Sequence, residues 1–196
     1  MATITVPRTR LYDVSVAEFG IRQSVFLSTS PTDGSTRTVE VPGARWVMTL
    51  TFPAQFNTDR AYIEALFASL RAQSNRLSMG HPLRREPRGT LRGSPTLGAT
   101  ASAGATTVNI NQSGSTVYAG DMIGVGGELK MVTEDRLSGL TSVPITPPMR
   151  GTFNAGTAVT WDWPATLWIV NGDSVRVPLG PVTSPQFSVD LVEVFA

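Results

Sequence analysis

The sequence predicts a mainly β fold in which one α-helix packs against the strands. Short runs that alternate apolar and polar residues recur along the chain, and turn-forming residues end most of them. Glycine and proline are abundant, at 18 and 14 of 196 residues, which is typical of a chain with many turns. Helical spacing of apolar residues is convincing in one stretch alone, residues 59–73. These three observations favour a β-rich protein with a single packed helix.

The clearest strand covers residues 45–52. Its alternating residues give one strongly apolar face, which is made up of Trp46, Met48, Leu50 and Phe52. Pro53 ends the strand, because proline has no N–H group to donate to a neighbouring strand. We therefore expect this face to lie in the core.

A helix is predicted over residues 59–73. Asn57 or Thr58 can cap its N-terminus, and Asp59 lies in the first turn, where the helix dipole favours an acid. Two adjoining rows of side chains form an apolar face about 100° wide. That face consists of Tyr62, Ile63, Leu66, Phe67, Ser69 and Leu70. We expect it to pack on the sheet, with Leu66, Phe67 and Leu70 in the core beside Trp46.

Three more strand-like runs precede the central strand, at residues 3–6, 11–16 and 22–28. The sequence Pro-Thr-Asp-Gly at residues 31–34 joins the last of them to another run at 36–41. Asp-Gly tolerates positive φ, so these two runs are predicted to form a hairpin. Pro42 and Gly43 are expected to turn the chain into the strand that begins at Arg45.

Residues 93–163 are predicted to form a small inserted β-barrel or sandwich module. A linker-like stretch, rich in Gly, Ala, Ser and Thr, opens it. Short strands follow at 106–110, 121–125, 128–133, 142–145 and 158–163. Gly126 and Gly127 make a tight hairpin between the second and third of these strands. The first and last strands are similar, as expected of an insert whose ends lie together.

The C-terminal residues 164–196 are predicted to complete a base domain that begins with residues 1–92. Runs at 166–170 and 174–177 flank Asn171 and Gly172, and Asn-Gly is the strongest hairpin signal. A final strand at 186–195 is expected to pair with earlier strands of the base domain.

Charge and composition exclude several classes. The net charge is +1, so no overall field steers the chain to DNA or to a membrane. The absence of cysteine excludes disulfides, thiolate nucleophiles and cysteine-based metal sites. The N-terminus has no apolar signal core, and no run approaches 18 apolar residues. We expect a protein that is made in the cytoplasm, is not secreted by a signal peptide and does not span a membrane.

No catalytic, cofactor or metal site is predicted. His81 is the only histidine, which is too few for a zinc site, and no G-x-S-x-G motif supplies a triad serine. Glu134, Asp135 and Asp162 are the nearest candidates for a glycosidase pair of carboxylates. Acids in polar turns are usually solvated, so the sequence favours a protein that is not an enzyme.

Arginines are concentrated after the helix, and Glu86 is the sole acid among them. Arginine is enriched at protein interfaces, so we predict that Arg84, Arg85 and Arg88 are interface residues. Nucleic-acid binding is the alternative. It is disfavoured because no aromatic residue lies between Gln73 and Arg92 to stack on bases.

Three stretches resemble minor tail proteins of long-tailed bacteriophages, of the distal tail protein type. They are residues 46–52 with the helix and segments 70–76, 80–82 and 87–90; residues 119–127 with 147–150 and 155–159; and residues 187–195. The resemblance implies a tail-tube-like β-sandwich with a packed helix. It also implies a virion structural protein whose base domains form a ring, typically hexameric, that joins the tail tube to the hub or baseplate. The inserted module then faces tail fibres, receptor-binding proteins or host glycan, and nucleic acid meets the protein only by passing through the lumen.

A carbohydrate- or receptor-binding tail module is the alternative function. In this hypothesis Tyr118, Phe153, Trp161 and Trp163 of the insert stack on sugars at the cell surface, whereas packing inside the barrel is the simpler role for the same rings. A hydrolase of cell-wall polysaccharide is a third reading.

Overall fold

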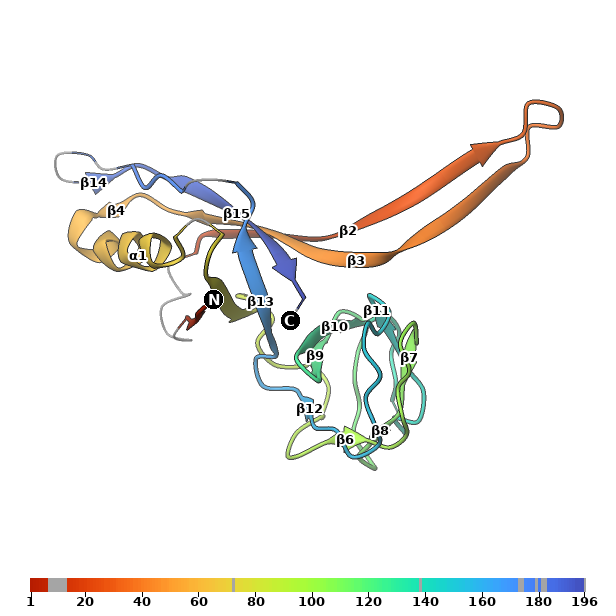
Figure 1. Cartoon of the computed structure of the whole chain (residues 1–196). Helices are drawn as coiled ribbons and strands as arrows, with labels where there is room; N and C mark the ends of the chain where they lie inside the picture. The colour runs from red at the N-terminus through yellow and green to blue at the C-terminus, as the bar shows by residue number, and fades with distance from the viewer. Residues whose placement is uncertain are drawn as a thin grey trace.

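The computed structural model describes residues 1–6, 14–71, 73–137, 139–172, 175–178, 180 and 183–195 (Figure 1). The described part is mainly β with one helix, which confirms the predicted class. The elements are β1 (Thr3–Thr5), β2 (Val16–Thr29), β3 (Thr36–Phe52), β4 (Gln55–Phe56), α1 (Asn57–Ser69), β5 (Arg76–Gly80), β6 (Thr96–Leu97), β7 (Thr107–Val108), β8 (Ile110–Asn111), β9 (Met122–Val125), β10 (Glu128–Val132), β11 (Val143–Thr146), β12 (Val159–Thr160), β13 (Ala165–Val170), β14 (Thr183–Ser184) and β15 (Phe187–Val194).

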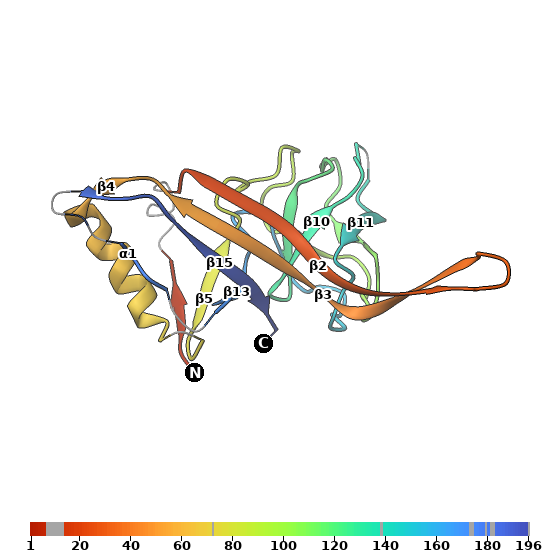
Figure 2. The same ribbon diagram turned by 90° about the horizontal axis from the view of Figure 1, so that it is seen from above.

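A six-stranded sheet forms the centre of the molecule, in the order β1-β5-β13-β15-β3-β2. Only the β1–β5 pair among these neighbours is parallel. The sheet combines strands from both ends of the chain, because β13 and β15 lie between β5 and β3 (Figure 2). The final strand therefore pairs with earlier strands, as the sequence predicts.

One face of this sheet carries the core. The predicted apolar face of β3 is buried throughout, and Trp168, Val189 and Leu191 extend it across β13 and β15. The helix covers one end of this face, where the rings of Phe67 and Phe52 lie 6.1 Å apart. The helix buries Ile63 and Phe67, Leu70 is buried just after its end, and Leu66 is partly buried against them. Within the described residues, no helix lies on the opposite face of the sheet (Figure 1).

The helix covers Asn57–Ser69, so it begins earlier and ends earlier than the predicted 59–73. Arg71 adopts a left-handed conformation with a φ of 47°, which stops the helix. Asn75 then caps the end, because its N–H donates to Leu70 O at 3.1 Å and its side chain donates to Ser69 O at 2.9 Å. The predicted N-cap residues 57–59 have side chains outside the described part.

The inserted segment forms sheets of its own. A five-stranded sheet, in the order β12-β9-β10-β11-β7, curves into a half-barrel, and β6 pairs with β8. In the described part, no strand of residues 93–163 joins the six-stranded sheet. The half-barrel has its own apolar core, which includes Leu91 from the preceding segment. The domain boundaries themselves stay predictions.

The Gly126-Gly127 hairpin is confirmed between β9 and β10, where Val125 pairs with Glu128 and both glycines have positive φ. Two other expectations are wrong. Pro42 and Gly43 form a bulge inside a continuous β3 instead of a turn, and residues 175–178 form no strand. The strand predicted at 11–16 lies largely outside the described residues.

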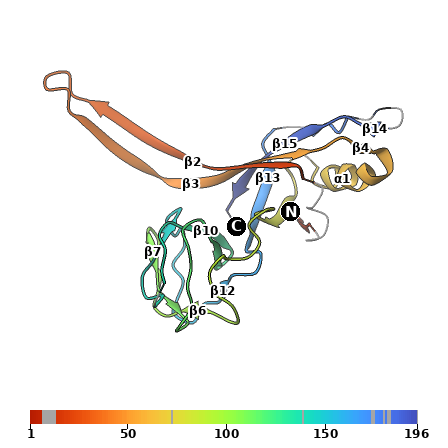
Figure 3. The same cartoon turned by 180° about the vertical axis from the view of Figure 1, so that it is seen from behind.

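The β2–β3 pair continues far beyond the body of the molecule. At the bulge, Gln23 of β2 lies opposite the three residues 42–44 of β3, because Arg22 pairs with Arg45 and Ser24 pairs with Val41. We call the hairpin beyond the bulge, residues 24–41, the arm. Figures 1 and 3 show it as a two-stranded ribbon that extends well past the other elements.

Candidate interaction surfaces

The arm exposes apolar side chains on both of its faces. Phe26 is 72% exposed, Leu27 is 70% exposed and Val39 is 61% exposed. Cross-strand partners share a face, so Phe26 and Val39 lie together on one side, with Arg37 beside them. Leu27 lies on the other side. A ribbon of two strands with water on both faces buries little of its own apolar surface.

The turn at the end of the arm is well ordered by hydrogen bonds. Asp33 Oδ1 accepts from the N–H of Ser35 at 3.0 Å and from its hydroxyl at 2.8 Å. Gly34 has a φ of 68°, which a glycine adopts without strain. Hydrogen bonds from Ser30 and from Ser35 lower the pKa of Asp33 to about 2. The tip is therefore closed and acidic over a wide pH range.

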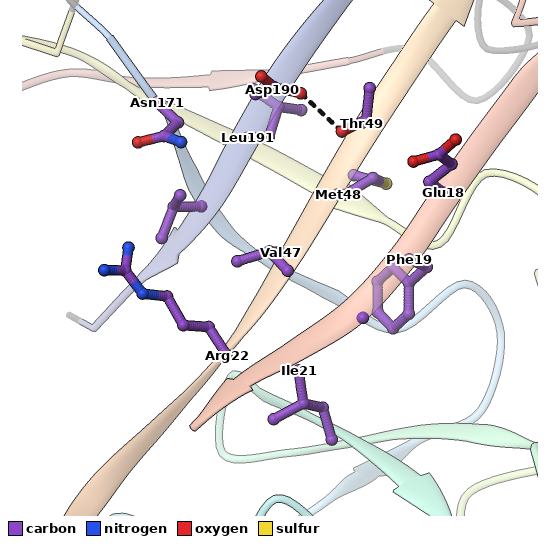
Figure 4. Close-up of a pocket in the computed structure, with 12 residues that line it drawn as sticks. Glu18, Phe19, Ile21, Arg22, Val47, Met48, Thr49, Asn171, Asp190 and Leu191 are labelled. Atoms are coloured by element: carbon purple, nitrogen blue, oxygen red, sulfur yellow. Dashed lines mark hydrogen bonds between the residues drawn. The ribbon is translucent and has the colours of Figure 1, made fainter. Parts of the chain in front are cut away.

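The uncovered face of the six-stranded sheet forms a shallow groove of about 660 Å³ (Figure 4). Glu18, Thr49 and Asp190 lie in register across β2, β3 and β15, and Thr49 Oγ1 donates to Asp190 Oδ1 at 2.6 Å. Val47 and Val192 form the next row. In the described part, no strand pairs with the outer edge of β2. An open edge of this kind is a template for a strand of another chain.

A second groove, of about 690 Å³, lies where the arm meets the inserted module. We call it the arm-base groove. Its lining is mostly apolar or small, and Glu40 and Arg150 supply its charges. It consists of Glu40, Gly43, Ala44, Ala103, Gly104, Thr106, Pro147, Pro148, Met149, Arg150 and Phe195. Four parts of the chain that are distant in sequence therefore build one concave surface.

Buried ion pairs fix the module against the sheet beside this groove. Arg150 forms a salt bridge with Glu193, whose carboxylate is fully buried. The same carboxylate accepts from the N–H of Trp46 at 3.1 Å and from the hydroxyl of Thr166 at 2.9 Å. The Arg150 guanidinium also lies 3.7 Å from the centre of the Phe195 ring. Its charge is thus used within the chain.

A second pair, Lys130 and Glu128, lies in the module at 2.7 Å. Burial lowers the pKa of the Lys130 ammonium. Burial alone raises the pKa of Glu128, but the hydrogen bonds from Lys130 and from the N–H groups of Arg150 and Gly151 outweigh it and lower that pKa. Together the two pairs keep four charges close to the module–sheet junction without leaving any of them isolated.

The predicted interface arginines lie along one segment at the edge of the module. Arg84 is exposed and donates to Gly120 O at 3.3 Å. Arg85 is half-buried and donates to Pro82 O at 3.0 Å. The Arg88 side chain is largely exposed and lies 3.5 Å from Asp121. The structure thus brings Arg84 and Arg88 together around residues 119–121, whereas Arg85 is directed elsewhere.

The sequence analysis missed Asp121, which anchors this arginine segment. Its buried carboxylate accepts from the N–H groups of Arg88 at 2.9 Å, Gly89 at 3.4 Å and Tyr118 at 2.8 Å. The signal was weak, because an aspartate at the start of a short strand usually marks a turn. Asp121 therefore positions the arginines without itself presenting a reactive group.

The four aromatic residues predicted to stack on sugars lie at separate places. Tyr118 lies 5.7 Å from the Arg88 guanidinium, and Trp161 lies 4.8 Å from that of Arg92. Phe153 packs on the module core, and Trp163 packs on the core of the six-stranded sheet. In the described part, no ring–ring contact joins any two of them. The structure does not bring them together as one platform.

His81 is buried, and its imidazole closes a turn. Its Nδ1 accepts from the N–H groups of Leu83 at 3.1 Å and Arg84 at 3.0 Å. Burial, with a smaller contribution from the Arg84 charge, lowers the pKa of His81 to about 4. The ring is therefore neutral at pH 7, and the nitrogen that a general base would use is occupied by backbone hydrogen bonds.

Comparisons with protein-family models and with curated proteins give no match. Among the described residues, no group of three or more His, Cys, Asp or Glu side chains is placed to hold a metal ion. The same residues include no helix long and apolar enough to cross a membrane. The exposed arm, the open edge of β2 and the arm-base groove are the candidate interaction surfaces of the described part.

Proposed function

We propose that this protein is a structural protein of a phage tail tip, which forms a ring that joins the tail tube to the hub or baseplate. The observation that carries the proposal is the arm. Its apolar side chains Phe26, Leu27 and Val39 leave most of their surface exposed within their own chain. Covering each of them contributes about 1.5–3 kcal/mol, so a partner that covers Phe26, Leu27 and Val39 gains a sizeable part of an interface energy.

A ring of identical copies agrees with the shape of the molecule. The arm projects from one end of the sheet, and a head-to-tail contact that uses such a projection produces either a closed ring or an open filament. The open edge of β2 offers a second surface for a neighbouring copy. The sequence resemblance adds the expectation of a tail-tube-like sandwich and of six copies.

In the proposed ring the sheets surround a lumen through which nucleic acid passes, and the inserted modules face outward. The module then presents its surface to tail fibres, to receptor-binding proteins or to host glycan. The protein works through shape and contact, without a cofactor and without catalysis. It is made in the host cytoplasm and is located in the virion.

Electron microscopy tests the proposal directly. Purified protein is imaged alone and with the neighbouring tail proteins, and phage particles are labelled with an antibody against the chain. We expect closed rings and label at the tail tip. Protein that stays monomeric under all these conditions, or label that is absent from particles, contradicts the proposal.

The role of Arg84 is tested by a charge reversal. The Arg84 side chain is exposed and donates one long hydrogen bond, to Gly120 O at 3.3 Å, so Arg84→Glu leaves the fold intact while reversing the charge at the proposed interface. We expect the variant to fold and to lose particle assembly. Arg176→Glu, at another exposed arginine, is the matched control and retains assembly. A normal particle yield from Arg84→Glu shows that this arginine segment is not part of the interface.

A further inference from the structure

We propose that the arm of one copy docks in the arm-base groove of the next copy. The inference rests on the proposed ring and names its donor and acceptor surfaces. It commits to a second copy of this chain as the occupant. The reasons are the match between one face of the arm and the groove, the complementary charges of Arg37 on the arm and Glu40 in the groove lining, and the position of the groove.

The donor surface is the face of the arm that carries Phe26, Val39 and Arg37. Phe26 and Val39 are a cross-strand pair, and Arg37 pairs with Ser28 on the same face. This face therefore combines two exposed apolar side chains with one cation. The opposite face carries Val25 and Leu27 with threonines and Glu40, so both faces expose apolar side chains but differ in charge. The first face therefore combines apolar side chains with a cation, whereas the second combines them with an acid.

The acceptor surface has the reverse character. Pro147, Pro148, Met149 and Phe195 make an apolar floor, and a volume of about 690 Å³ accommodates a phenyl ring together with its neighbours. Glu40 is the acidic residue of the lining. The positive charge of Arg150 is already paired with Glu193, so it does not repel an arriving arginine. An incoming Arg37 thus meets the carboxylate of Glu40 on the other copy.

The arm cannot fill this groove within its own chain. The groove lies at the base of the arm, whereas Phe26 lies beyond the bulge on a ribbon that leads away from the body (Figure 3). Six residues of each strand lie beyond the bulge, a length of roughly 20 Å at 3.3 Å per residue. A copy displaced along the arm direction brings its own groove to that distance. The contact is head-to-tail and repeats from copy to copy.

Cross-linking between cysteines tests this docking in the full-length protein. The chain contains no cysteine, so every disulfide comes from introduced residues. Ser28→Cys lies on the donor face beside Phe26 and leaves the apolar side chains in place, and Ala103→Cys lies in the groove. The two single variants are mixed and oxidised. We expect a disulfide-linked dimer, and at least a several-fold lower yield with the control Thr29→Cys, which lies on the opposite face.

A charge exchange tests the same contact without disulfides. Arg37→Glu and Glu40→Arg are each expected to reduce ring formation, and the double variant is expected to restore it. If rings form but Ser28→Cys does not cross-link to Ala103→Cys and the double charge variant does not restore assembly, the docking is overturned. The proposed function is then left intact. A link between two copies of Ser28→Cys, showing that arms pair with each other, also overturns it. Failure of both the rings and the cross-link overturns both proposals.

Discussion

His81 illustrates how burial decides the charge of a side chain. The ring lies 4.6 Å from that of Phe19, and Arg84 is the charged group that acts on it. Its pKa is lowered from 6.5 to about 4, so the unfolded chain binds a proton at a pH at which the folded chain does not. Stability is then complete above about pH 6.5 and is lost as the pH falls toward 4. The expected loss between about pH 7 and pH 5 is about 2 kcal/mol.

His81→Asn tests this prediction. The Asn amide oxygen can accept the N–H groups of Leu83 and Arg84 in place of Nδ1, but it does not titrate. Urea unfolding of both proteins is compared across the same pH interval. We expect the variant to lose most of the pH dependence that the natural protein shows. The carboxylate of Glu128 does not interfere, because its lowered pKa places its own effect at lower pH. If the free energy of unfolding of His81→Asn depends on pH as strongly as that of the natural protein, another group causes the effect.

The paired glycines of the β9–β10 turn distinguish the backbone strain of adding a side chain from its steric clash with a neighbour. Both have positive φ, at 58° for Gly126 and 85° for Gly127. A Cβ on Gly126 lies 1.9 Å from the ring of Phe153, whereas a Cβ on Gly127 lies in open space. Gly127→Ala is expected to cost about 1–2 kcal/mol, from the backbone alone. Gly126→Ala is expected to destabilise the protein clearly more, because its Cβ also meets the Phe153 ring. Equal urea midpoints for the two variants contradict this ring contact.

At the scale of the element, β3 divides into two halves with different surroundings. Residues 47–51 pair with both β2 and β15, and large side chains such as Met48 and Leu50 are buried there, whereas residues 36–41 pair with β2 alone and are largely exposed. Stability is local, so the outer half is expected to open far more often. Amide hydrogen exchange in the isolated protein should be orders of magnitude faster in the outer half. In assembled rings it should slow, and an outer half that is equally protected without partners contradicts this view.

The sequence predicts elements that depend on local pattern and misses those that depend on pairing. The alternation in β3, the Gly-Gly turn and the helix are visible locally. The strand β5 is not predicted. Its residues Leu77 and Met79 do alternate with Arg76 and Ser78, but the run is short and lies close to the helix, so its pattern is weak. The strand predicted after Asn171 is absent from residues 175–178, because β5 and β15 already pair with both edges of β13.

The candidate surfaces are predictable from sequence to different degrees. The hairpin of the arm follows from its Asp-Gly turn, but its projection does not, because nothing local says that β15 ends at Val194 and leaves the outer half of β3 paired with β2 alone. The arginine segment is visible as a cluster of charge. The arm-base groove is not, since its walls come from residues 40–44, 103–106, 147–150 and 195. A surface whose residues come from distant parts of the sequence can be recognised only once the fold is known.

At the scale of the whole molecule, the buried Arg150–Glu193 pair decides how firmly the module is held on the sheet. Glu193 belongs to β15, and Arg150 belongs to the module, where it also donates to Ala44 O at 3.0 Å. Trp46 adds a second tie, because its indole N–H donates to Leu129 O at 2.8 Å. Removing one charge of a buried pair leaves the other without compensation, at a cost of about 3–5 kcal/mol.

Glu193→Gln is therefore expected to lower the free energy of unfolding by about 3–5 kcal/mol. Glu134→Gln is the matched control, because Glu134 pairs with Arg136 but is well exposed, and such pairs contribute about 0–1 kcal/mol. Arg150→Met combined with Glu193→Gln removes both buried charges, so it should be less destabilised than the sum of the single variants. Urea unfolding of the natural protein, Arg150→Met, Glu193→Gln and the double variant measures this coupling, and Glu134→Gln is measured beside them. Additive effects mean that the module is held by its apolar contacts, among them Leu129 against the sheet core, and that the ion pair contributes little.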